Sequence, residues 1–143
     1  MKLANPTGKT LEELQSGLSV LYPGTKIRKA FLGIGPNNLV VPVSGGLKHV
    51  IRPIKKNTLL VADFIPPVLI IIGALFASVL IISVIFTLII GAPVIGGFGG
   101  VGFVLIFLAI KAIYKSANKE KFDRFYTDLN AAMTHSSQPG SIF

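Results

Sequence analysis

The sequence has no cysteine. Disulfide bonds and thiolate metal sites are therefore excluded, and cysteine usage indicates nothing about the redox compartment. The first eight residues, Met1 to Gly8, include one lysine but no apolar segment of the kind that a cleaved signal peptide requires. We therefore expect any insertion into a membrane to use internal segments.

Charge is missing from the middle of the chain. The 47 residues between Asp63 and Lys111 include no Asp, Glu, Lys, Arg or His, and their polar side chains are those of Ser78, Ser83 and Thr87. With a mean hydropathy of +0.70 and 51% hydrophobic residues, the whole chain is too apolar for an ordinary soluble domain. A helix that crosses the roughly 30 Å hydrocarbon core needs about 20 residues, so the stretch is long enough for two crossings.

The predicted fold class is an α-helical membrane hairpin of two transmembrane helices with a small cytoplasmic α+β unit. The membrane segment is expected over 64–114, with spans at about 67–90 and 93–114 and a turn at Gly91-Ala92-Pro93. Proline suits the first turn of a helix because its missing N–H would have no intrahelical partner there. Lysine and arginine flank the two spans while the turn is uncharged, which predicts a multi-pass protein of the cell (inner) membrane with both termini cytoplasmic.

Small residues at helical spacing predict how the two spans pack. Helices in lipid associate through close backbone approach at small residues and through occasional hydrogen bonds. An antiparallel turn centred near Ala92 places Gly96 and Gly100 level with Thr87 and Ser83. The full set of candidate helix-packing residues is Gly73, Ala77, Ser83, Thr87, Gly96, Gly99 and Gly100. Two interpretations stay open: these residues close the hairpin on itself, or the glycine-rich face receives a helix of another subunit.

The segment before the hairpin, residues 1–63, predicts a helix and a small β-meander. Thr10 and Glu13 match a capping box, so a helix is expected over 11–21. Turn residues separate four short candidate strands, at 27–32, 39–43, 49–54 and 58–62. Pro42 and Pro53 each remove a ladder donor, which predicts an edge position or a bulge for their strands.

The segment after the hairpin, 115–133, has the pattern of an amphipathic helix. Its apolar side chains recur at helical spacing at Phe122, Phe125, Tyr126, Leu129 and Met133. We expect this helix to pack on the N-terminal sheet and complete the α+β unit, since a meander of about 55 residues buries too little by itself. The alternative is a helix that lies along the lipid headgroups. The tail, 134–143, is expected to be disordered.

No motif in the sequence predicts catalysis, a cofactor or a metal. Gly8-Lys9-Thr10 resembles the end of a phosphate-binding loop, but the position of the first glycine is Leu3. His49 and His135 are far apart in sequence, and each is expected at the surface. The six acidic residues are scattered and give no acid–base pair. The sequence therefore predicts a protein that is not an enzyme, with no catalytic, cofactor-binding or metal-binding residues.

The net charge of +8 favours an anionic partner. The candidates for contact with lipid headgroups or an anionic partner are Arg52, Lys55, Lys56, Lys111, Lys115 and Lys119. The expected partners are membrane lipids and other membrane-protein subunits or further copies of the chain; no nucleic acid is expected, since no binding module is recognisable. The predicted function is a small accessory or assembly subunit of a membrane complex, which anchors a basic cytoplasmic domain. The alternative is a homo-oligomeric pore-forming or membrane-permeabilising protein of the holin-like kind.

Overall fold

The structure is a computed structural model that describes residues 1–30, 33–95 and 99–134. The chain divides into two compact units. Unit 1 contains Met1–Ile65 together with the residues from Glu120 onward, and unit 2 contains Pro66–Lys119. The predicted tail after residue 134, with His135, lies outside the described residues.

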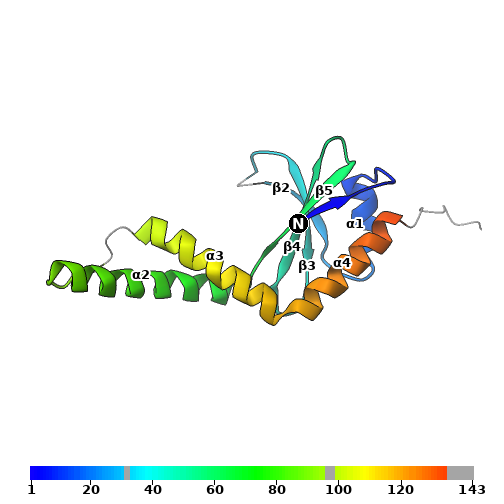
Figure 1. Ribbon diagram of the computed structural model, residues 1–143. Coiled ribbons are helices and arrows are strands. Elements are labelled where there is room, and N and C mark those ends of the chain that lie inside the picture. Colours follow the sequence, from blue (N-terminus) through cyan, green and yellow to red (C-terminus); the bar gives the residue numbers. More distant parts are fainter. Residues whose placement is uncertain (31–32, 96–98, 135–143) are drawn as a thin grey trace, which may run out of the picture. The chain divides into compact units, whose positions relative to one another are not determined.

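Unit 1 is built on a five-stranded antiparallel sheet (Figure 1). Its strands, in chain order, are β1 (Lys2–Ala4), β2 (Lys26–Lys29), β3 (Asn37–Pro42), β4 (Lys48–Ile54) and β5 (Leu59–Ile65). The spatial order is β1-β5-β4-β3-β2, so that β1 lies at one edge and pairs with β5 through Leu3 and Leu60. β1 is not among the predicted strands, because three residues are too few to show an alternating pattern.

The two prolines lie in inner strands, so the expectation of an edge position is wrong. β3 and β4 each have a strand on both sides. Pro42 is the last residue of β3, and Pro53 lies beyond the last pair between β3 and β4, which joins Leu39 to Ile51. Each proline is therefore placed where the ladder has already ended on one side, and the missing N–H costs little.

Two helices cover one face of this sheet and close the core of unit 1. α1 (Leu11–Ser19) begins with the capping box at Thr10 and Glu13, as predicted, and α4 (Lys119–Thr134) is the amphipathic helix. Between β3 and β4 lies a single 3₁₀ turn, η1 (Ser44–Gly46). The core combines apolar side chains of both helices and the sheet: Leu3, Leu11, Leu14, Leu18, Leu39, Val41, Ile51, Leu60, Ala62, Phe125, Leu129 and Met133.

His49 is buried in this core, which corrects its expected surface position. Its exposed fraction is 0%, and its ring stacks on that of Phe125 with the ring centroids 3.7 Å apart. The physical reason is the register of β4, because His49 pairs with Val41 and Phe64, whose side chains lie on the face that the helices cover. Without the register, a polar residue at a strand end is expected to face water.

Unit 2 consists of α2 (Val68–Ile90) and α3 (Gly99–Ala117), which lie side by side (Figure 1). α2 ends at Gly91, whose φ of 72° is left-handed and suits glycine. Within the described residues, α2 is the one helix that is long and apolar enough to cross a membrane. The predicted fold class, with two transmembrane spans, is therefore wrong.

The predicted second span and the helix α3 differ in where they begin. The helix was expected from Pro93, whereas the described helix α3 begins at Gly99, and residues 96–98 lie outside the described residues. Only 12 residues of α3, from Gly99 to Ile110, precede its first lysine. At 1.5 Å per residue they extend about 18 Å, well short of the roughly 30 Å hydrocarbon core.

Candidate functional site

The sheet of unit 1 has a second face that α1 and α4 do not cover, which we call the open face. Alternate residues of the strands point to it, and apart from the buried Asn38 they are exposed or half-buried where their neighbours in the core are buried. One row across the sheet contains neighbouring residues of four strands, namely Lys26, Val40, Val50 and Asp63. A second row contains Arg28, Asn38, Arg52, Val61 and Lys2.

The open face is strongly basic. The described residues give it five cationic side chains and one carboxylate, namely Lys2, Lys26, Arg28, Lys48, Arg52 and Asp63. The guanidinium of Arg52 donates to the side-chain oxygen of Asn38 through Nε over 3.3 Å, which orients one of these cations. Lysine and arginine side chains held on a rigid sheet in this way attract anionic groups.

Apolar side chains lie between the cations of the open face. They are Val40, Val50, Val61 and Ile65, and a hollow of about 470 Å³ lies among Val40, Val50, Ile65 and the basic residues of β2. The rows of the open face contain no aromatic side chain among the described residues, so the face lacks the stacking platform on which proteins bind single-stranded nucleic acid. The chemistry of the face suits a ligand that is acidic and partly apolar.

The six cations predicted to contact an anionic partner are distributed over both units. Arg52 lies on the open face, and Lys55 and Lys56 form the turn between β4 and β5 with positive φ. Lys111 is half-buried and Lys115 exposed on α3, and Lys119 is the first residue of α4. The prediction therefore includes one cation of the open face and misses four, Lys2, Lys26, Arg28 and Lys48. The spacing of two between Lys26 and Arg28 and between Val50 and Arg52 was the available signal.

The predicted helix-packing residues lie at various depths in unit 2. Gly73 is exposed, and a Cβ added to it would meet nothing within 4 Å. Ala77, Ser83 and Thr87 are half-buried, and the Thr87 hydroxyl accepts a hydrogen bond from the Val94 N–H over 3.1 Å. Gly99 and Gly100 are the first two residues of α3, whereas Gly96 lies outside the described residues.

The closest described packing between α2 and α3 uses residues outside the predicted helix-packing set. Ala74 and Ser78 are the buried residues of α2, and a Cβ added to Gly102 of α3 would collide with the side chain of Ile82. Ala74, Ser78 and Ile82 follow one another at intervals of four, so they lie on one face of α2. The Ser78 hydroxyl donates to the carbonyl of Leu75 over 2.7 Å and so satisfies its own hydrogen bond within the helix.

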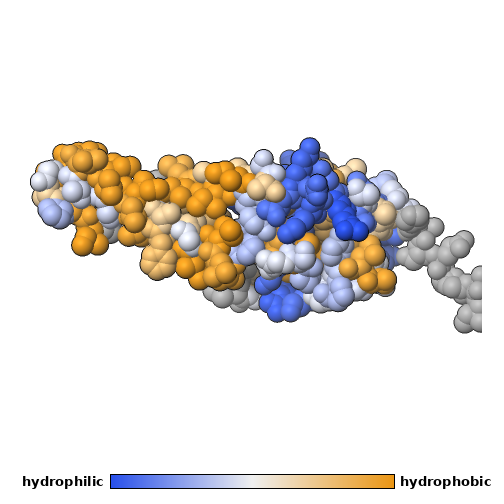
Figure 2. Space-filling view, turned by 90° about the horizontal axis from the view of Figure 1, so that it is seen from below, coloured by the Kyte–Doolittle hydropathy of each residue, from blue (hydrophilic) through white to orange (hydrophobic). Residues whose placement is uncertain are grey.

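The exposed surface of α2 in unit 2 is largely apolar. In α2, Leu69 is 82% exposed and Leu88 is 78% exposed, and Figure 2 shows the orange surface of these helices at its left. Soluble proteins seldom expose contiguous apolar patches larger than a few hundred Å². This surface suits contact with lipid or with another apolar protein surface.

Comparison with known proteins gives no match to a family model, to a curated protein or to a solved structure. Within residues 1–30, 33–95 and 99–134, no three or more His, Cys, Asp or Glu side chains are placed to hold a metal ion. The geometry of the open face and of unit 2 is therefore the basis for any functional argument.

Proposed function

We propose that the chain is a non-enzymatic accessory or assembly subunit of a membrane complex. Unit 2 anchors it in the bilayer, and the open face of unit 1 binds an acidic segment of a partner subunit. The observation that supports this most strongly is that a basic sheet and an uncharged apolar helix are adjacent in the chain. The apolar helix α2 follows the basic sheet after only Pro66 and Pro67.

The dimensions and surface of α2 support the anchoring role. Its 23 residues extend about 34 Å, close to the roughly 30 Å of a hydrocarbon core, and their mean hydropathy is 3.1 over the most apolar window. Large apolar side chains point outward on several sides of the helix, among them Phe76 at 71% and Leu80 at 65% exposure. Exposed to water, this surface would cost about 25 cal/mol per Å² of apolar area.

Both ends of the described chain belong to unit 1, because α4 packs on the sheet. We therefore place both ends on one side of the membrane, to which the chain returns after α2 within the uncharged residues 92–110. α3 contributes the last 12 of these residues and does not span the bilayer as a helix by itself. Basic residues lie on both sides of unit 2 in the sequence, Lys55 and Lys56 before it and Lys119 and Lys121 after it. Since lysine and arginine near a membrane-inserted helix are retained in the cytoplasm, this side is the cytoplasmic side of the cell membrane.

A protein partner fits the open face better than a layer of lipid headgroups. The cations of the face alternate with Val40, Val50, Val61 and Ile65. A headgroup layer offers anionic groups but no apolar side chain, whereas a peptide segment with acidic and apolar residues satisfies both. An anchor that confines subunit and partner to one membrane also raises their effective concentration, so a modest interface is sufficient.

The experiment compares two double charge reversals in the full chain. Arg28→Glu with Lys48→Glu changes the open face, and Lys55→Glu with Lys56→Glu makes the same change of charge in the turn between β4 and β5. Each protein is purified from its native membrane in mild detergent, and cross-links between lysines and partner carboxylates are mapped by mass spectrometry. We expect the unmodified protein and the turn variant to cross-link from Lys26 to one acidic segment of another subunit, and the face variant to lose that partner.

Retention of the partner by the face variant with its loss from the turn variant would contradict the proposal. A protein that purifies only with copies of itself, and that releases dye from vesicles, would instead support the pore-forming alternative.

A further inference from the structure

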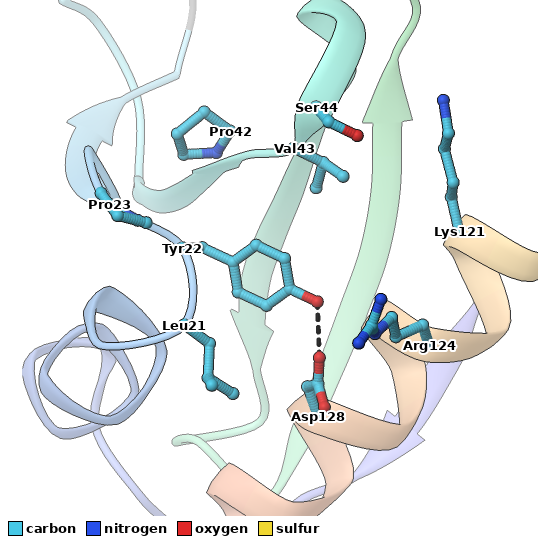
Figure 3. Close-up of a pocket in the computed structure, with 9 residues that line it drawn as sticks. All are labelled: Leu21, Tyr22, Pro23, Pro42, Val43, Ser44, Lys121, Arg124 and Asp128. Carbon is cyan, nitrogen blue, oxygen red and sulfur yellow. Dashed lines mark hydrogen bonds between the residues drawn. The ribbon is translucent and has the colours of Figure 1, made fainter.

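Unit 1 has a second concavity, with a volume of about 490 Å³, which shares Pro42 with the hollow of the open face (Figure 3). Its walls come from three places: the segment after α1, the end of β3 with the start of η1, and one face of α4. The lining residues are Leu21, Tyr22, Pro23, Pro42, Val43, Ser44, Lys121, Arg124 and Asp128. We call it the α4 pocket. Its size lies in the range of small-molecule binding sites.

The α4 pocket has two cations at adjacent positions of one helix face. Lys121 and Arg124 are three residues apart on α4, so their side chains leave the helix on the same side. The ammonium of Lys121 lies 3.9 Å from the point where a Cβ added to Gly45 of η1 would be. The Lys121 side chain therefore extends toward the turn that begins with Ser44. Within the described part of the chain, neither cation is within ion-pair distance of a carboxylate.

The carboxylate of the pocket is hydrogen-bonded to a neighbour. Tyr22 donates its hydroxyl proton to Asp128 Oδ2 over 2.6 Å, as the dashed line in Figure 3 shows. Burial, followed by the hydrogen bond to Asp128, raises the pKa of Tyr22 well above its ordinary value, so the donor stays protonated. This pair forms one wall of the pocket and holds Asp128 toward Tyr22.

The third polar group is the hydroxyl of Ser44, which makes no hydrogen bond with the described residues. Lysine supplies a point charge, arginine supplies two parallel N–H donors, and a hydroxyl supplies a further donor. Together they match an anion with several acceptor oxygens. A carboxylate has two such oxygens, whereas a phosphate monoester has three and about two negative charges near neutral pH.

We propose that the α4 pocket binds a phosphate monoester through Lys121, Arg124 and Ser44. The position of Lys121 in the chain indicates two sources for this group. Lys121 follows the last residue of α3 by only four positions, so a phosphate monoester on a lipid headgroup lies within reach if unit 2 is in the bilayer. A soluble phosphate monoester is the other source.

The test uses the full chain in nanodiscs and two matched double variants. Lys121→Gln with Arg124→Gln removes the pocket cations, and Lys55→Gln with Lys56→Gln removes the same charge from the turn between β4 and β5. Binding of inorganic phosphate is measured by calorimetry in discs of phosphatidylcholine. Retention of phosphatidic acid is measured by native mass spectrometry in discs that also contain phosphatidylglycerol, whose phosphate is a diester.

We expect the pocket variant to bind its ligand at least about tenfold more weakly, as the loss of charge-assisted hydrogen bonds requires, and the turn variant to bind as the unmodified chain does. Selective retention of phosphatidic acid identifies a lipid source, and binding of inorganic phosphate alone identifies a soluble one. Ser44→Ala keeps both charges and is expected to weaken binding by a smaller factor.

Failure of the unmodified chain to bind either probe overturns the proposal. So does equal binding by the pocket variant and the unmodified chain, with circular dichroism confirming that both are folded. Neither result bears on the partner of the open face, which is tested with other residues.

Discussion

Units 1 and 2 place their large apolar side chains in opposite ways. In unit 1, Phe122, Phe125 and Leu129 of α4 are buried at 1% exposure or less. In unit 2, Leu69 and Leu88 of α2 are about four-fifths exposed. The hydrophobic effect drives apolar groups out of water in both cases. The comparison therefore indicates that the two units are built for different surroundings.

The sequences of α4 and α2 already contain this difference. α4 alternates apolar residues with charged ones such as Asp123 and Asp128, which leaves one apolar stripe for the sheet. α2 has no charged residue on any side, and its two buried residues, Ala74 and Ser78, are small. Small residues allow a neighbouring helix to approach closely, while the rest of the surface of α2 is apolar and largely exposed.

The largest effect is expected from Phe125→Ala in α4. The Phe125 ring stacks on His49 and contacts Tyr22 edge-on, so its removal leaves a cavity in the core. We expect the free energy of unfolding of unit 1 to fall by about 3–5 kcal/mol, measured by chemical denaturation in detergent. Phe76→Ala, on the exposed surface of α2, is the matched control and should leave unit 1 unchanged. An equal loss in both variants would show that the two units do not differ as described.

The next effect concerns Leu80, near the middle of α2 and 65% exposed. An arginine at the centre of an inserted helix costs about 2.5–3.5 kcal/mol relative to water, whereas leucine is favourable. We therefore expect Leu80→Arg to move the protein from the membrane pellet to the soluble or aggregated fraction after an alkaline wash. Leu80→Phe should remain in the pellet. An arginine variant that pellets as the unmodified chain does would mean that this side of α2 does not face lipid.

A smaller effect is expected at the contact between α2 and α3. A side chain at Gly102 would collide with Ile82, so Gly102→Leu should destabilise unit 2 by about 1–3 kcal/mol in a thermal unfolding assay in detergent. Gly73→Leu adds the same side chain where a Cβ meets nothing within 4 Å and should be neutral. Combining Gly102→Leu with Ile82→Ala should restore part of the loss. Equal effects at Gly73 and Gly102 would contradict the described packing.

The smallest effect is a pH dependence in unit 1. The raised pKa of Tyr22 means that the folded state retains a proton that the unfolded chain releases near pH 10. The stabilisation by the hydroxyl is therefore complete below about pH 10 and is lost as the pH rises toward the folded pKa. We expect Tyr22→Phe to cost about 1–2 kcal/mol at pH 8 and less at about pH 11. A difference between the two proteins that stays constant over this range would contradict the role of the bond to Asp128.

Local signals predicted the parts of the fold that depend on neighbouring residues. The capping box at Thr10 and Glu13 marks the start of α1, and the apolar spacing from Phe122 to Met133 marks α4. Features that depend on distant pairing were missed. β1 forms only because β5 is available to pair with it, and the burial of His49 follows from the register of β4.

The candidate sites were less predictable than the helices, because a sequence shows which residues are charged but not which of them share one face of the sheet. Lys26, Arg28 and Lys48 come together only when β2, β3 and β4 are in register. The second membrane span was predicted from the length of the uncharged apolar stretch and from Pro93, which do not fix where a helix begins. Within α3, only the 12 residues from Gly99 to Ile110 precede Lys111.

Insertion of α2 into the membrane is tested most directly by labelling single cysteines, since the chain has none of its own. Ser16→Cys places a thiol on the exposed side of α1, and Ala92→Cys places one just after the end of α2; both positions are exposed. A membrane-impermeant maleimide is applied to intact cells and to inverted vesicles. We expect Ala92→Cys to react in intact cells and Ser16→Cys only in inverted vesicles. Reaction of both thiols from the same side would contradict the account.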